Sequence, residues 1–151
     1  MRTDPPRGSF RLMYNIEMHN DSLYRISLKC LIKNSAGDVL VVKEAGREFW
    51  DLPGGGMEHG DDINTAIARE LKEEVDYEGD FTFSTLSMDE PVRLLSRDVW
   101  QLRIILNVTP STFTFSAGED ADEIQFINPA ALKDSDSEHE QKVYQYAATD
   151  R

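Results

Sequence analysis

The sequence WDLPGGGMEHGDDINTAIARELKEEVDY spans Trp50 to Tyr77. Proline fixes its own φ angle and glycine loses the most backbone entropy on ordering, so the segment LPGGG predicts a tight loop. Asp61 and Asp62 are good N-cap residues, and apolar residues then recur at four-residue spacing. The stretch therefore predicts a glycine loop followed by an amphipathic helix that begins near Ile63.

Three carboxylates lie on one face of the predicted helix. Glu70, Glu73 and Glu74 are three and four residues apart, beside the apolar stripe. Like charges at this spacing repel each other, and Mg²⁺ is commonly held by one or two carboxylates together with substrate phosphates. A charged face that only contacts solvent is the alternative for such a pattern taken alone. Combined with the glycine loop, the pattern favours a site for a divalent metal.

The same stretch resembles the motif of the Nudix (MutT-like) hydrolases. That motif is a glycine, five residues, an acid, seven residues, Arg-Glu, an aliphatic residue, any residue and Glu-Glu. The matching positions here are Gly55, Asp61, Arg69, Glu70, Leu71, Glu73 and Glu74. Asp61 stands where a glutamate is usual, Asp76 where a glycine is usual, and Tyr77 where a small aliphatic residue is usual. The resemblance covers about residues 23 to 147.

Periodicity elsewhere in the chain predicts strands and two more helices. Apolar and polar residues alternate over 24–33, and the apolar run 39–42 after a turn predicts a hairpin with that strand. Further strands are predicted at 81–88 and 99–109, with a short one at 112–115. Asn128 and Ser137 are capping residues that predict a short helix and a final helix. This order predicts a mixed sheet with helices on its faces.

The resemblance sharpens the fold to the Nudix alpha/beta/alpha sandwich, an α+β arrangement in the wider α/β class. Residues 23–151 are then the Nudix hydrolase domain, and residues 1–22 are an N-terminal arm. Many members of the family are homodimers, and the arm is a candidate for such an interface.

The resemblance also implies roles for individual residues. Glu73 and Glu74 are the expected main Mg²⁺ ligands, the Gly54 carbonyl a third, and Glu70 a further ligand or the general base. Arg69 is expected to hold a glutamate of the motif in position. Mn²⁺ is an expected substitute for Mg²⁺. A late loop often supplies one more acid in this family, and the candidates are Glu119, Asp120, Asp122 and Glu123. Their spacing does not choose among them, and a solvated acidic loop is the alternative.

A few other polar and aromatic residues are candidates for substrate binding. Arg47 is placed to meet a phosphate or a carboxylate, with ordinary surface charge as the alternative. Trp50 is a candidate for stacking on a base, although a tryptophan beside a buried helix is more often part of the core. Arg103 and Asn107 lie on the polar face of the strand at 99–109, where either a substrate cleft or solvent explains them.

Length and composition limit the remaining possibilities. The 151 residues, 40% hydrophobic and 29% charged, fit a single globular domain. The net charge of −12 argues against binding to polymeric nucleic acid, which requires a basic surface. No apolar run approaches the length of a signal peptide or a membrane span, so we expect a cytoplasmic protein that does not bind membranes. Cys30 lies in an alternating apolar stretch, which predicts a small buried hydrophobic residue rather than a nucleophile.

The function implied by the resemblance is that of a Mg²⁺-dependent hydrolase. Such enzymes cleave the phosphoanhydride bond of a nucleoside diphosphate linked to another moiety, so the expected partner is a small nucleotide derivative. The alternative is a Nudix-like regulatory domain that binds a nucleotide without cleaving it, and the departures at Asp61 and Asp76 are its only support.

Overall fold

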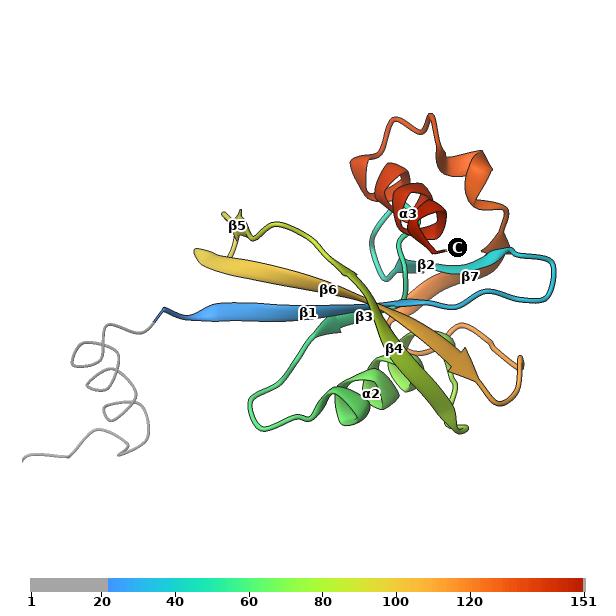
Figure 1. The fold of residues 1–151 in the computed structure, drawn as a ribbon, viewed down its shortest axis with the longest axis horizontal. Helices are drawn as coiled ribbons and strands as arrows, with labels where there is room; N and C mark the ends of the chain where they lie inside the picture. Colours follow the sequence, from blue (N-terminus) through green and yellow to red (C-terminus); the bar gives the residue numbers. More distant parts are fainter. Residues whose placement is uncertain (1–21, 151) are drawn as a thin grey trace, which may run out of the picture.

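The computed structural model describes residues 22–150 (Figure 1). In chain order the elements are β1 (Tyr24–Leu31), β2 (Val39–Glu44), β3 (Gly54–Gly56), α2 (Ile63–Val75), β4 (Phe81–Met88), β5 (Val92–Leu94), β6 (Val99–Pro110), β7 (Ala121–Ile127), the 3₁₀ helix η1 (Pro129–Leu132) and α3 (Glu138–Thr149). Apart from Ser22, the predicted N-terminal arm lies outside the described residues, and its role in dimerisation stays a prediction.

The strands form two sheets. The larger sheet has the order β3-β1-β6-β4, with β5 also paired to β6. Strands β1 and β6 are parallel, while the other pairs in this sheet are antiparallel. The smaller sheet consists of β2 and β7, which are antiparallel. The predicted mixed sheet is therefore confirmed.

The predicted hairpin of β1 with β2 is wrong. The turn after β1 brings Lys33 and Val39 into one isolated antiparallel bridge, but the two strands then enter different sheets. Strand β1 is instead flanked by β3 and β6, from later parts of the chain. Local turn residues predicted the change of direction correctly, but they carry no information about which distant strand completes the pairing.

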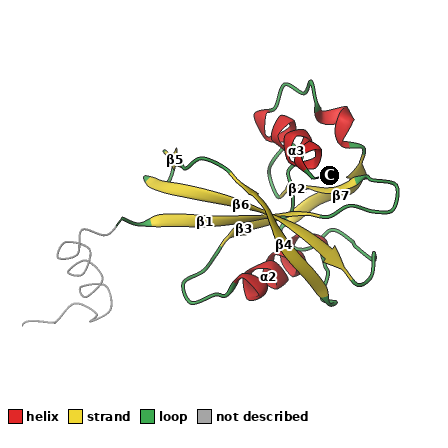
Figure 2. Cartoon of the chain, in the orientation of Figure 1, coloured by secondary structure: helices red, strands yellow, loops and turns green. Residues whose placement is uncertain are grey.

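Helices cover both faces of the large sheet, as Figure 2 shows. Because successive residues of a strand point to opposite faces, Leu28 and Cys30 pack in the core on the α2 side, whereas Leu31 packs in the core on the α3 side. The predicted helical sandwich is confirmed. Cys30 is fully buried, and burial raises its pKa to about 12, which fits an inert core residue.

Other boundaries follow the local sequence with small differences. Helix α2 begins at Ile63 as predicted, with the Asp62 carboxylate accepting a hydrogen bond from the Thr65 N–H group. Residues 112–115 form no strand, because Phe115 packs its ring against Tyr77 and Phe126 instead. None of the helices between residues 22 and 150 has the length and apolar character that a membrane crossing requires.

Candidate functional site

The three glycines of β3 form an edge strand rather than the predicted loop. Gly54 pairs with Lys29 of β1 and has a φ angle of +141°, which side chains rarely allow. A Cβ atom at Gly54 would lie 2.0 Å from the backbone oxygen of Leu28. Only glycine therefore lets β3 approach β1 this closely.

Two carboxylates of α2 lie directly against this glycine strand. Oε2 of Glu74 accepts a hydrogen bond of 2.9 Å from the Gly54 N–H group, and Glu74 is only 4% exposed. The Glu70 carboxylate lies against Gly55, where a Cβ atom would come within 2.6 Å of Oε1. The missing side chains of β3 thus make room for both acids.

Burial makes these two carboxylates unusually reluctant to ionise. Desolvation raises the pKa of Glu74 to about 8, with Lys29 opposing part of the shift. Desolvation also raises the pKa of Glu70 to about 7, and the neighbouring charge of Glu73 adds to that shift. Both acids would therefore be stabilised in their charged form by a bound cation.

The end of α2 is tied to the loop that carries the candidate additional acids. The N–H groups of Gly118 and Asp120 donate to the carbonyls of Glu74 and Glu73, at 3.0 and 2.9 Å. Partial burial raises the pKa of Glu73, and the charge of Asp120 raises it further. Asp120 is therefore the candidate that the structure brings beside a carboxylate of the motif.

The other three candidate acids lie elsewhere. Glu123 pairs with Lys43 at 3.4 Å, and Asp122 accepts a hydrogen bond from the Gly46 N–H group at 2.9 Å. Glu119 is exposed to solvent. The sequence could not make this distinction, because it depends on the backbone hydrogen bonds that join the loop to α2.

Arg69 pairs with Asp61, which stands where the motif usually has a glutamate. Its Nη1 atom lies 2.8 Å from Oδ2 of Asp61, and its Nη2 atom donates to the carbonyl of Gly56 at 3.4 Å. No ion pair formed within residues 22–150 joins Arg69 to the three helix glutamates. Asp61 thus anchors Arg69 near β3, although its side chain is shorter than that of the usual glutamate.

The second departure is accommodated at the end of the helix. Asp76 is the C-cap residue of α2 and adopts the left-handed conformation, with φ of 50°. Aspartate tolerates this conformation better than most non-glycine residues. Its carboxylate also pairs with Lys72 at 2.6 Å. Asp76 therefore ends the helix where a glycine would otherwise do so.

Sequence patterns did not reveal a buried lysine, Lys29, on the face of β1 opposite to α2. The Nζ atom of Lys29 lies 3.2 Å from the carbonyls of Leu52 and Gly54 and 3.2 Å from Oδ2 of Asp51. The Gly54 carbonyl, a predicted metal ligand, thus accepts a hydrogen bond from Lys29 here. The alternation of β1 placed Lys29 on the polar face, but only its contacts with residues 51–54 and with Glu44 show that it is buried.

A cavity of about 260 Å³ adjoins the glycine strand on this face. Its polar lining is dominated by basic side chains that come from β1, β6 and two loops. The charged side chains of this lining are Arg25, Lys29, Arg47, Arg97, Arg103, Glu44 and Asp51, and His139 and Gln101 also line the cavity. Gly54 and Gly55 line it too, so the cavity borders the strand that α2 contacts from the other side.

The predicted substrate-binding residues divide between this cavity and other places. Arg47 and Arg103 line the cavity. Trp50 is half-buried against the core on the α3 side, with Nζ of Lys43 at 4.6 Å from the centre of its ring. Asn107 donates to Asp150 at 3.1 Å, away from the cavity.

The acids fit a hard divalent cation by their chemistry. Oxygen atoms are the ligands that Mg²⁺ prefers, and neither the buried Glu74 nor the partly buried Glu70 forms an ion pair within residues 22–150. Among residues 22–150, however, the structure does not bring three acidic, histidine or cysteine side chains into one group close enough to hold a metal. Glu70 and Glu74 face β3, whereas Glu73 lies beside Asp120.

Comparison with known proteins gives the family. The family model described as the NUDIX domain matches residues 23–147. The chain belongs to the Nudix family. It is 46% identical over 52 residues to an RNA pyrophosphohydrolase of Actinobacillus pleuropneumoniae, covering 34% of this chain and 25% of that protein. It is 35% identical over 95 residues to the 8-oxo-dGDP phosphatase NUDT18 of Mus musculus, covering 59% of this chain and 26% of that protein.

Solved structures of Nudix proteins share the fold. The MutT protein of Methanosarcina mazei Go1 matches with a TM-score of 0.66 at 16% identity, covering 85% of this chain and 95% of that one. The Nudix domain of Shewanella oneidensis NrtR, solved with ADP ribose, matches with a TM-score of 0.66 at 13% identity, covering 92% and 96%. This Nudix chain spans only about a quarter of the length of the curated relatives named above.

The raised pKa values of the buried acids predict how stability depends on pH without metal. Between an unfolded pKa of 4.5 and the folded value of about 8, Glu74 is ionised in the unfolded state but protonated in the folded state. Folded stability is therefore lost as pH rises through this window. In EDTA, we expect the Tm of the unsubstituted protein to fall by about 5–10 °C between pH 5 and pH 8.5, measured by differential scanning calorimetry. We expect this fall to be absent in Glu74→Gln.

The glutamine variant is a suitable comparison because its side-chain oxygen can still accept the hydrogen bond from Gly54. Mg²⁺ should raise the Tm of the unsubstituted protein more at pH 8.5 than at pH 5.5, since metal binding displaces protons from its ligands. Parallel Tm curves for the two proteins across the whole pH range would contradict the prediction.

Proposed function

We propose that this Nudix protein is a Mg²⁺-dependent pyrophosphohydrolase. Its substrate would be a nucleoside diphosphate linked to another moiety, cleaved at the phosphoanhydride bond. The observation that carries the proposal is the juxtaposition across β3: acids of α2 lie against Gly54 and Gly55, and a basic cavity opens at the same two residues. The names of the relatives, RNA pyrophosphohydrolase and 8-oxo-dGDP phosphatase, support cleavage at a phosphate group.

The glutamates are assigned by their places in the Nudix motif, and Asp120 by its position beside Glu73. Glu73 and Glu74, with Asp120 beside Glu73, would hold Mg²⁺, and Mn²⁺ would substitute for it. When bound, the ion would neutralise charge on the phosphate oxygens and lower the pKa of the attacking water. Glu70 would accept the proton of that water at a carboxylate oxygen, because a base with a pKa of about 7 is suited to neutral pH.

Other residues hold the geometry or the substrate. Arg69, paired with Asp61 and Gly56, fixes the start of α2 against β3. Lys29 joins the carbonyls of Leu52 and Gly54 and so keeps the glycine strand in place. Arg47 at the cavity wall would bind phosphate oxygens of the substrate.

A second candidate function is recognition of a nucleotide without cleavage. The Nudix domain of NrtR, whose fold this chain shares, was solved with ADP ribose. Within residues 22–150, no three acidic, histidine or cysteine side chains lie close enough together to bind a metal ion. These observations keep a binding domain as the alternative, although Glu70, Glu73 and Glu74 are all retained.

A substrate panel separates the two functions. The protein would be incubated with Mg²⁺ or Mn²⁺ and with nucleoside triphosphates, ADP-ribose, nucleotide sugars, dinucleoside polyphosphates and a short RNA bearing a 5′-triphosphate. Mass spectrometry of reactions in ¹⁸O-labelled water should show two phosphate-bearing products, one carrying the label. Calorimetric binding of a nucleotide without any product, unchanged in Glu73→Gln, would favour the second function.

A further inference from the structure

Three arginines converge on the cavity without a carboxylate partner. Arg25 comes from β1, Arg97 from the turn between β5 and β6, and Arg103 from β6. None of the ion pairs formed within residues 22–150 includes any of them. The other two cations of the cavity are different, because Lys29 pairs with Asp51 and Arg47 pairs with Glu44.

The fold holds these like charges together against their repulsion. Burial lowers the pKa of Arg25, and the charge of the nearby Arg97 lowers it further. The Arg25 guanidinium donates to the side-chain oxygen of Gln101, which is itself buried. Burial lowers the pKa of Arg103, but the Tyr146 hydroxyl and the nearby carboxylates outweigh burial and raise it. Carboxylates such as Glu70 near Arg25 and Asp51 near Arg103 act on these charges only from beyond ion-pair distance.

Arg25 lies beside β3, and Arg97 lies farther along the cavity. The Arg25 guanidinium lies against β3, since a Cβ atom at Gly56 would come within 2.6 Å of its Nη2 atom. Arg97 lies in the turn at the end of β5, and Figure 1 shows this turn at the end of the sheet remote from the C-terminus. The cavity therefore runs from the site of proposed cleavage toward a second, basic region.

The charge and shape of that region indicate its ligand. A diphosphate link that already carries a divalent ion is close to neutral and does not require three more cations. The cavity lining contains no phenylalanine, tyrosine or tryptophan on which a base could stack, and its histidine, His139, is already stacked on Phe49. The guanidinium fork matches phosphate oxygens, and a phosphomonoester carries about −1.5 to −2 charge at pH 7.

We propose that Arg25, Arg97 and Arg103 form a subsite for a phosphomonoester group that the substrate carries in addition to the anhydride that is cleaved. The substrate class is thereby narrowed to nucleotide derivatives with a further phosphate on a non-aromatic part of the molecule. The assignment to a substrate rests on the proposed hydrolase function, but binding of the anion does not.

Binding without metal tests the subsite by itself. Inorganic pyrophosphate would be titrated in EDTA by isothermal titration calorimetry into the unsubstituted protein and into Arg97→Gln and Arg103→Gln. We expect each variant to weaken binding about tenfold or more, as for loss of a charged hydrogen bond. Binding weaker than about 1 mM in the unsubstituted protein, or equal binding by all three proteins, would overturn the proposal.

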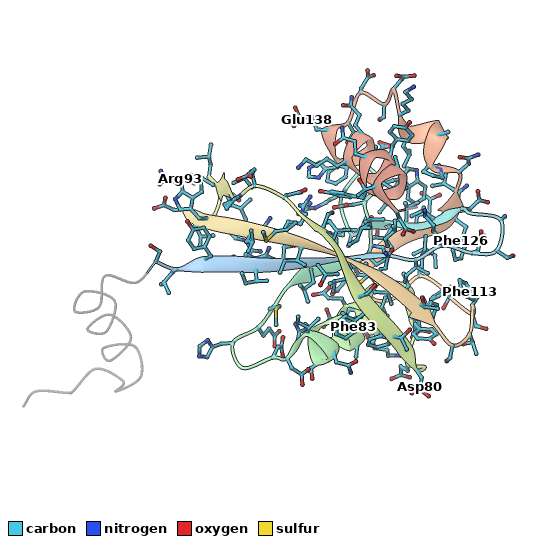
Figure 3. The ribbon with its side chains drawn as sticks, in the orientation of Figure 1. Asp80, Phe83, Arg93, Phe113, Phe126 and Glu138 are labelled. Atoms are coloured by element: carbon cyan, nitrogen blue, oxygen red, sulfur yellow. The ribbon has the colours of Figure 1, made fainter. Side chains whose placement is uncertain are left out.

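Arg93→Gln is the matched control. Arg93 lies on β5, at the end of the same hairpin (Figure 3), and pairs with Asp98 outside the cavity. This substitution removes the same charge close to Arg97, so it should leave pyrophosphate binding within about twofold if position rather than total charge matters. Arg97 is exposed in a turn, so Arg97→Gln keeps the test valid even if Arg103→Gln folds poorly.

Matched substrates test whether the anion belongs to the substrate. ADP-ribose and its 2′-phosphate, and dephospho-coenzyme A and coenzyme A, differ by one phosphomonoester. We expect the phosphorylated member of a pair to be favoured about tenfold or more in kcat/KM, mainly through KM, and Arg97→Gln to lower that ratio. Equal cleavage of both members would overturn the subsite and leave the hydrolase function standing. Arginine-dependent binding of pyrophosphate without cleavage of any nucleotide would instead contradict the hydrolase function and support the anion site.

Discussion

Replacing Glu73 by glutamine is expected to lower kcat about a thousandfold or more on whichever nucleotide the protein cleaves. A bound metal stabilises the charge of the transition state by several kcal/mol. Each 1.36 kcal/mol of that stabilisation changes the rate about tenfold, so loss of a metal ligand should lower kcat strongly. Glu73 is the cleanest of the three glutamates to replace, because Glu74 is almost fully buried and bonded to Gly54, whereas Glu73 is only partly buried. Steady-state kinetics at saturating Mg²⁺ would measure the loss.

Glu78→Gln is the control for this substitution. Glu78 lies just beyond α2, exposed, and contacts only Lys72 among the ion pairs of the described residues. Its replacement should leave kcat within about twofold, as is usual for exposed surface positions. Asp120→Asn should fall between the two, and Glu119→Gln should resemble the control, if proximity to Glu73 is what makes Asp120 the additional acid. A kcat for Glu73→Gln close to that of the unsubstituted protein would contradict the assignment of Glu73 as a metal ligand.

The second large effect is expected on stability. Gly54→Ala should lower the free energy of unfolding by about 3 kcal/mol or more, measured by urea denaturation. The added Cβ would lie 2.0 Å from the Leu28 oxygen, a backbone atom that cannot move without separating β3 from β1. The substitution would also disturb the hydrogen bond from Gly54 to Glu74, so the folded fraction should lose Mg²⁺-dependent activity as well.

Gly60→Ala separates the clash from backbone strain. Gly60 also has a positive φ angle, of +90°, but no atom lies within 4 Å of the position where its Cβ would be. This variant should therefore lose only about 1 kcal/mol, the cost of strain alone. Equal losses for the two variants would show that the close approach of β3 to β1 does not make Gly54 indispensable.

Local sequence patterns predicted most of the elements and some of the site. Capping and apolar spacing predicted the first residue of α2, Ile63, correctly. Alternation predicted strands at 24–33 and 99–109, and the observed strands span 24–31 and 99–110. The same patterns failed for residues 112–115, where aromatic packing replaced strand pairing, and for the partner of β1. Pairing between distant strands and packing of loop aromatics depend on the whole fold rather than on neighbouring residues.

By itself, the sequence determined which face of α2 carries the three carboxylates. The spacing of Glu70, Glu73 and Glu74 places them on one face of any helix that they form. The glycines before them have no side chains, so neighbouring groups can approach their backbone closely. These properties follow from helix geometry and from the absence of side chains, so they require no knowledge of distant contacts.

Only the tertiary structure decided what surrounds that face. Hydrogen bonds from the loop to α2 bring Asp120, one of four candidate acids, beside Glu73. The segment 51–54 and Glu44 enclose Lys29 on the polar side of β1. The convergence of Arg25, Arg97 and Arg103 likewise joins residues up to 78 positions apart (103 − 25) through the parallel pairing of β1 with β6. Because charges interact through space and not along the chain, their sum at one cavity becomes apparent only once the strands are in register.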